Sequence, residues 1–110
     1  INFCKNHLLD FKFNISINYS IANISNFNTN FFKKNKTTVI TNPPYGIRLE
    51  SGDNFKSIHL GFRKILDSGA NLYSIFPLNH NFIEDNFDYN LESKLYNGPI
   101  ECGVYNIKNV

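Results

Sequence analysis

The segment best suited to chemistry is Asn42-Pro43-Pro44-Tyr45-Gly46, which directly follows a run of β-branched residues. Two consecutive prolines stiffen the backbone, and Pro43 has no amide hydrogen, so the carbonyl groups of Asn42 and Pro43 can point in fixed directions. These carbonyls and the Asn42 side-chain oxygen can accept both hydrogens of an exocyclic amine, and Tyr45 offers a ring that can stack on a purine. The segment therefore predicts a pocket for a nucleobase that has been flipped out of its stack.

An exocyclic amine held in this way becomes a better nucleophile. Acceptors on its hydrogens favour a pyramidal nitrogen and stabilise the positive charge that develops as the nitrogen attacks an electrophilic methyl group. Gly46 would let the chain turn beside the base without a Cβ clash. The alternative is structural: an Asn-Pro-Pro sequence can also do no more than end a strand at a loop.

The rest of the chain predicts an α/β fold, because apolar runs of strand length alternate with longer mixed segments. Strands are predicted where apolar residues alternate with polar ones, and helices where apolar residues recur at spacings of three and four. We expect strands at 13–19, 37–41, 72–76, 93–96 and 100–107, a short apolar stretch at 21–24, helices at 55–66 and 79–87, and a hairpin turn at Asn97-Gly98-Pro99. The strand at 37–41 is expected to be buried, with Asn42 and Pro43 at its carboxyl end, where open α/β sheets bind their ligands.

Composition excludes several classes of protein. The 110 residues make one domain or less, and no run of about 18 apolar residues or secretory signal appears, so we expect no membrane span. Eleven basic and nine acidic residues are too even a balance to indicate nucleic-acid binding by themselves. The cluster of Lys33, Lys34 and Lys36 favours a solvated loop before a strand over a phosphate contact.

The cysteines and histidines do not indicate a metal site. Cys4 and Cys102 lie at opposite ends of the chain without a Cys-x-x-Cys pair, which favours reduced thiols in a cytoplasmic protein. The three histidines are widely separated, and His59 lies on the apolar face of the expected helix, which predicts a core histidine.

Two motifs resemble a known family. Residues 42–45 resemble the Asn-Pro-Pro-Tyr motif of S-adenosylmethionine-dependent methyltransferases that modify exocyclic amines, and residues 41–49 resemble the longer form in RNA guanine-N2 methyltransferases that carry a THUMP RNA-binding domain. Residues 94–102 resemble the Lys-x-Tyr-Asn-Gly-x-Ile hairpin that closes the catalytic domain of the bacterial large-subunit ribosomal RNA members. The resemblance covers about residues 20–107. It implies a Rossmann-like class I methyltransferase sheet with an antiparallel C-terminal hairpin.

The resemblance also implies an activity, a cofactor and residue roles. The implied enzyme transfers a methyl group from S-adenosyl-L-methionine to a guanine N2 amine in large-subunit ribosomal RNA. The implied roles are catalytic for Asn42, Pro43, Pro44 and Tyr45, substrate-binding for Tyr45, Gly46 and Arg48, and cofactor-binding for Asn23 and Asn42.

The chain departs from this family at the cofactor site. All six glycines lie at position 46 or later, so the glycine-rich turn after a first strand is absent, and Asn23 stands where the family usually has an Asp facing the cofactor adenine. With no Met in the sequence, we expect residues 1–110 to be the C-terminal part of a catalytic domain, without its N-terminal strands. Such a chain should expose unpaired strand edges and be marginally stable. Two alternatives stay open: an adenine-N6 methyltransferase, and a non-catalytic remnant or scaffold that binds a partner.

Overall fold

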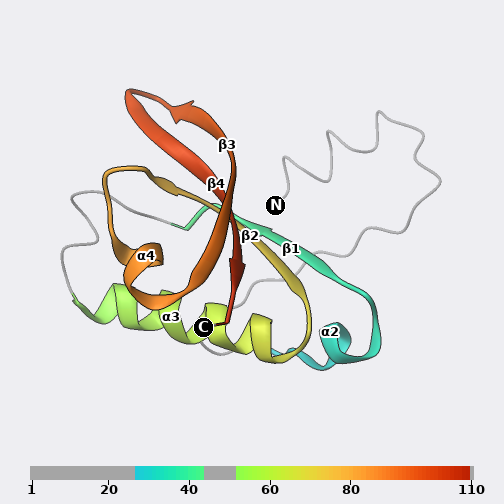
Figure 1. Cartoon of the computed structure of the whole chain (residues 1–110). Helices are drawn as coiled ribbons and strands as arrows, with labels where there is room; N and C mark the ends of the chain where they lie inside the picture. The colour runs from blue at the N-terminus through green and yellow to red at the C-terminus, as the bar shows by residue number, and fades with distance from the viewer. Residues whose placement is uncertain (1–26, 44–51, 110) are drawn as a thin grey trace, which may run out of the picture.

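A computed structural model describes residues 27–43 and 52–109, without the side chains of residues 52–54. The described residues form a mixed four-stranded sheet, with two helices packed against one of its faces (Figure 1). In chain order the elements are α2 (Asn30–Lys34), β1 (Thr38–Thr41), α3 (Gly52–Asp67), β2 (Asn71–Pro77), α4 (Phe82–Asn86), β3 (Asp88–Asn97) and β4 (Ile100–Lys108). The expected α/β class is confirmed.

The last strand lies inside the sheet. The strand order is β1-β2-β4-β3, with β1 parallel to β2, and β4 antiparallel to both β2 and β3. It follows that β3 runs in the same direction as β1 and β2, and that β4 is the one reversed strand of the described sheet. Gly98 closes the β3–β4 turn with a φ of 62°, a left-handed conformation that favours glycine. The antiparallel C-terminal hairpin is therefore confirmed.

Helix α3 supplies one side of the core. Its apolar residues recur at spacings of three and four, and Ile58, Phe62 and Ile65 are all buried. The helix ends at Asp67, and Gly69, with a φ of 87°, reverses the chain toward β2 and donates its N–H to the Leu66 carbonyl at 3.0 Å. Helix α3 covers the helix predicted at 55–66 and begins three residues earlier.

The centre of the core is the α3-facing side of β2. Leu72, Ser74 and Phe76 alternate along this strand with no exposed surface, and the register pairs Leu72 with Ile107 and Ser74 with Tyr105 on β4. Rings from the helices complete the core, with Phe82 stacked on Phe76 at 5.4 Å between centroids. Because β2 pairs on both sides and is covered by helices, it is the best-buried strand of the described residues.

Strand β1 is less buried than the sequence predicts. Val39 packs against the core, whereas Ile40 points away from it and is 76% exposed. Within the part of the chain that the structure describes, β1 pairs only with β2, so it is an edge strand with one open face. The buried strand expected here is corrected to a half-exposed one.

Other boundaries also differ from expectation. Helix α2 occupies a region expected to be a loop, α4 is shorter than the predicted helix 79–87, and β3 begins at residue 88 instead of 93. In the early part of β3, Tyr89 and Leu91 alternate with polar residue types that are uncommon in strands, and pairing with β4 holds this part in the sheet. The strand expected at 13–19 and the stretch at 21–24 lie outside the described residues.

Candidate functional site

Asn42 and Pro43 lie where the sequence predicts, directly after β1. Thr41, the last residue of β1, pairs with Ser74 in the parallel ladder, so the carboxyl ends of β1 and β2 meet at the same edge of the sheet. Pro43 is buried and Asn42 is exposed. The proline therefore anchors the segment against the fold, while the asparagine side chain stays accessible to a ligand.

The remaining predicted site residues lie outside the described part of the chain. These are Pro44, Tyr45, Gly46, Arg48 and Asn23. The structure thus positions the first two residues of the Asn-Pro-Pro-Tyr segment and leaves the other assignments as predictions.

A cavity of about 300 Å³ opens at the carboxyl end of β2. Its lining residues are Leu78, Asn79, Pro99, Ile100 and Glu101, which come from the loop after β2, the hairpin turn and the start of β4. The Leu78 N–H donates to the Glu101 carbonyl at 3.0 Å, which extends the β2–β4 ladder and fixes the two sides of the cavity relative to each other. Because parallel strands end at a common edge, this cavity and Asn42 share that edge of the sheet.

The polar groups of this cavity come from Glu101 and Asn79. The Tyr96 hydroxyl donates a hydrogen bond to one carboxylate oxygen of Glu101 at 3.1 Å, and this bond and the negative charge raise the pKa of Tyr96. The phenol thus stays protonated and orients the carboxylate. A carboxylate and an amide beside apolar walls suit a small polar ring such as a nucleobase.

Sequence reasoning did not single out either of these two polar residues. Asn79 could have been predicted as a site residue, because it lies just after Pro77, where the second parallel strand ends. Glu101 lies within the hairpin motif but had no assigned role. Its position opposite the loop after β2 depends on strand register, which the sequence does not reveal.

His59 and His80 have structural roles among aromatic rings. The His80 ring lies 4.9 Å from the Phe55 ring, and its Nδ1 accepts the Phe82 N–H at 3.1 Å near the start of α4. The His59 ring lies 5.2 Å from that of Phe87, but His59 is only half-buried, so it packs at the margin of the core and not inside it as the sequence predicts.

His59 should make stability depend on pH. Burial, with a smaller contribution from the positive charge of Arg63, lowers the pKa of His59 below its ordinary value. Below about pH 6.5 the unfolded chain therefore binds more protons than the folded one. We expect the free energy of unfolding to fall as the pH decreases from about 7.5 to 5, and His59→Gln to reduce this fall, as measured by urea unfolding. An equal fall in both proteins would contradict this role.

Comparison with protein-family models, with curated proteins and with solved structures gave no match. In the described part of the chain, no helix is long and apolar enough to cross a membrane. No group of three or more His, Cys, Asp or Glu side chains among those residues is placed to hold a metal ion. The chain is thus defined by its mixed α/β sheet and by the polar edge at the carboxyl ends of β1 and β2.

Proposed function

We propose that this chain is the base-binding part of a cytoplasmic, S-adenosylmethionine-dependent methyltransferase that modifies a guanine N2 amine in large-subunit ribosomal RNA. The observation that carries the proposal is the position of Asn42 and Pro43 at the carboxyl end of β1. The exposed Asn42 amide lies next to the buried Pro43, at the edge of the sheet where ligands bind. This arrangement suits the binding of an exocyclic amine.

The topology supports the same proposal. The Rossmann-like methyltransferase sheet implied by the motifs ends in an antiparallel strand, and β4 is the one reversed strand of the described sheet. The hairpin that carries β4 also holds the motif at residues 94–102. Two sequence motifs and the direction of the last strand are thus mutually consistent.

The chemistry proposed for this chain is the binding of the amine. The Asn42 side-chain oxygen and the backbone carbonyls of Asn42 and Pro43 accept the amine hydrogens and favour a nucleophilic nitrogen. Tyr45 stacks on the base, and Arg48 braces the loop or contacts a phosphate. The cavity beside Asn79 and Glu101 provides space for the nucleotide at the same edge.

The described residues do not form a complete site for S-adenosylmethionine. The 300 Å³ cavity is only at the lower limit of about 300–1,000 Å³ for small-molecule sites, and no glycine-rich turn precedes it. We therefore assign base binding to this part of the chain and no step of methyl donation.

The test is a pair of titrations on the 110-residue chain. The first uses a short RNA containing 2-aminopurine, whose amine matches guanine N2 and whose fluorescence rises when the base leaves its stack. The second is a calorimetric titration with S-adenosylmethionine. Base binding without cofactor binding is the expected result. Binding of both would make the chain self-sufficient, and no response to the RNA would overturn the proposal. Competition by guanosine monophosphate but not by adenosine monophosphate would separate guanine N2 from adenine N6 specificity.

One observation favours a second candidate, a non-catalytic scaffold. The face of the sheet opposite α3 exposes Ile40, and Tyr73 and Ile75 on this face are only half-buried. A partly open apolar face is typical of a surface that packs against another protein or domain. Failure of both titrations would favour this candidate.

A further inference from the structure

Helix α2 carries two consecutive phenylalanines in different surroundings. Phe32 packs against the core, whereas the Phe31 side chain is 64% exposed. Because about 3.6 residues make one helical turn, neighbouring residues lie about 100° apart around the axis, and only one of these rings can face the core. A single exposed ring is common on protein surfaces, so what Phe31 can bind depends on its neighbours.

The Phe31 ring is held in place before any ligand binds. It lies edge-on to the Phe32 ring, with 6.4 Å between the centroids and 80° between the ring planes. The Asn35 side chain donates a hydrogen bond to the Phe31 carbonyl at 3.0 Å, and the Asn28 side chain accepts one from the Asn30 N–H at 2.9 Å. These bonds fix both ends of the short helix. A ligand that stacks on Phe31 therefore orders little of the protein, which lowers the entropic cost of binding.

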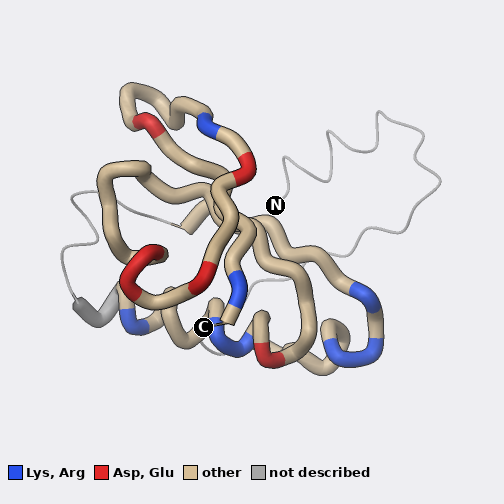
Figure 2. Tube along the Cα trace, viewed as in Figure 1, with Lys and Arg blue, Asp and Glu red and all other residues tan. Residues whose placement is uncertain are grey.

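Positively charged side chains lie next to this ring. Lys34 is three residues after Phe31, so the two side chains are neighbours on one face of α2, and Lys36 follows in the turn before β1; all three are exposed. Residues 27–43 contain three lysines and no acidic residue, whereas residues 84–101 contain five acidic residues and one lysine. Figure 2 shows basic residues along α2 and the turn after it, and acidic residues on α4 and the hairpin. A polyanion is therefore attracted to the α2 end of the molecule.

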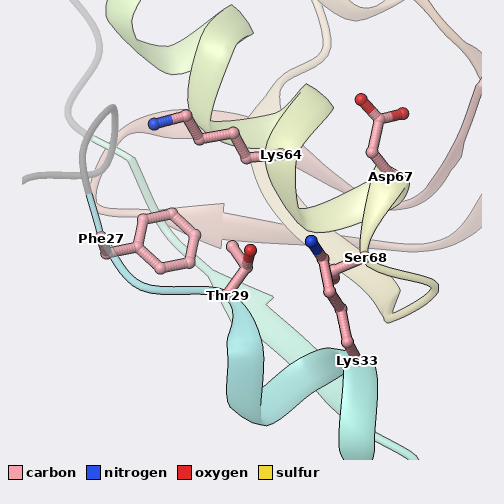
Figure 3. A pocket seen from close by; sticks show the side chains of 6 residues that line it. All are labelled: Phe27, Thr29, Lys33, Lys64, Asp67 and Ser68. Atoms are coloured by element: carbon pink, nitrogen blue, oxygen red, sulfur yellow. The ribbon is translucent and has the colours of Figure 1, made fainter.

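Lys33 belongs to the same helix but points elsewhere. Figure 3 shows its side chain extending from α2 toward Ser68 at the end of α3. There it lines a cavity of about 240 Å³ between the two helices, to which Thr29 and Asp67 also contribute. Because Lys33 is two residues from Phe31, the helix places the two side chains on different sides. Lys33 therefore adds to the positive charge of this end of the molecule without lying beside the exposed ring.

The end of the helix accounts for only part of this arrangement. Lys33 and Lys34 lie in the last turn of α2, where a positive charge is stabilised by the carbonyl end of the helix. Lys36 lies beyond the helix, and the helix dipole does not explain an exposed ring next to Lys34. An aromatic ring combined with ammonium groups on one exposed surface is typical of proteins that bind single-stranded nucleic acid.

We propose that Phe31, Lys34 and Lys36 form a binding surface for single-stranded nucleic acid. A base stacks on the Phe31 ring, and backbone phosphates contact the two ammonium groups. Stacking on an aromatic ring requires no particular base, so this surface adds affinity without sequence specificity. The inference changes the interpretation of the lysine cluster from a solvated loop to a phosphate contact. It does not depend on the proposed methyltransferase function.

The distance from this surface to Asn42 sets the length of nucleic acid that can reach both. Helix α2 precedes β1 and Asn42 follows it, so the two sites lie at opposite ends of a strand about 13 Å long. A stacked single strand advances about 3.4 Å per nucleotide, so at least about four nucleotides separate a base on Phe31 from a base at Asn42. Where one strand occupies both sites, α2 holds nucleotides that flank the modified base.

The test measures binding of a fluorescently labelled ten-nucleotide oligouridine to the 110-residue chain by anisotropy. Uracil has no exocyclic amine, so its binding is independent of the amine binding proposed for Asn42. We expect Phe31→Ala to weaken binding about tenfold and Phe31→Tyr to change it less than about twofold, because only alanine abolishes stacking. The logarithm of the affinity should fall with the logarithm of salt concentration, with a slope of about −1.4 for two phosphate contacts, and Lys34→Gln should make this slope about 0.7 less steep.

Lys33→Gln is the matched control, because it removes the same charge from another side of α2. It should change the salt slope much less than Lys34→Gln does. The proposal is overturned if oligouridine does not bind, if Phe31→Ala binds it as tightly as the native chain, or if the two lysine variants reduce the slope equally, since the attraction would then be a general effect of positive charge. Binding to phosphatidylserine vesicles without binding to oligouridine would assign the surface to a membrane and would also overturn it.

Discussion

Replacing Phe76 by alanine is expected to lower the free energy of unfolding by about 3–5 kcal/mol. Phe76 has no exposed surface, lies on the strand that pairs on both sides, and stacks on Phe82 at 5.4 Å. Its removal leaves a cavity that helix and sheet cannot close without losing other contacts. A domain of this size has a total stability of about 5–15 kcal/mol, so Phe76→Ala should remove a large part of it.

Two further variants make this prediction specific. Phe31→Ala removes the same number of atoms from a side chain that is 64% exposed, and it should change stability by less than about 0.5 kcal/mol. Phe76→Leu keeps most of the volume and should remain folded if Phe76→Ala does not. Urea unfolding followed by circular dichroism measures all three. Equal losses in Phe76→Ala and Phe31→Ala would contradict the placement of the core.

Replacing Asn42 by alanine is expected to weaken binding of the 2-aminopurine RNA about tenfold, with little change in stability. The exposed side chain contributes one acceptor, and one hydrogen bond to a partly charged group accounts for an effect of this size.

The control variants separate the acceptor from the shape of the side chain. Asn42→Asp keeps an oxygen acceptor and should retain more binding than Asn42→Ala. Asn90→Ala removes an exposed asparagine from β3, away from the proposed site, and should bind as the native chain does. Equal affinities of Asn42→Ala and the native chain would remove the main support for base binding.

Much of the fold follows from local signals in the sequence. The spacing of Ile58, Phe62 and Ile65 predicts α3, and the Asn-Gly pair before Pro99 predicts the hairpin turn, because each signal reflects a requirement of the local backbone. The early half of β3 has only a weak local signal, because its alternating Tyr89 and Leu91 are separated by residue types that are uncommon in strands. It is a strand because β4 is beside it, and pairing between distant residues is invisible to local patterns.

The same division applies to the candidate site. The position of Asn42 after a strand can be predicted, since two prolines end the strand at a known place. The cavity between Asn79 and Glu101 cannot be predicted from the sequence, because it depends on the register between β2 and β4.

The position of β4 between β2 and β3 constrains folding during synthesis. A nascent chain that has emerged only as far as β3 has no strand to join β3 to β2, and β2 then lacks its partner along one whole edge. The complete four-stranded sheet therefore cannot form until residue 108 has left the ribosome, although β1 can pair with β2 earlier. Until then the apolar residues of β2 are covered only by α3 and α4, so ribosome stalling within β4 should leave the chain sensitive to proteases.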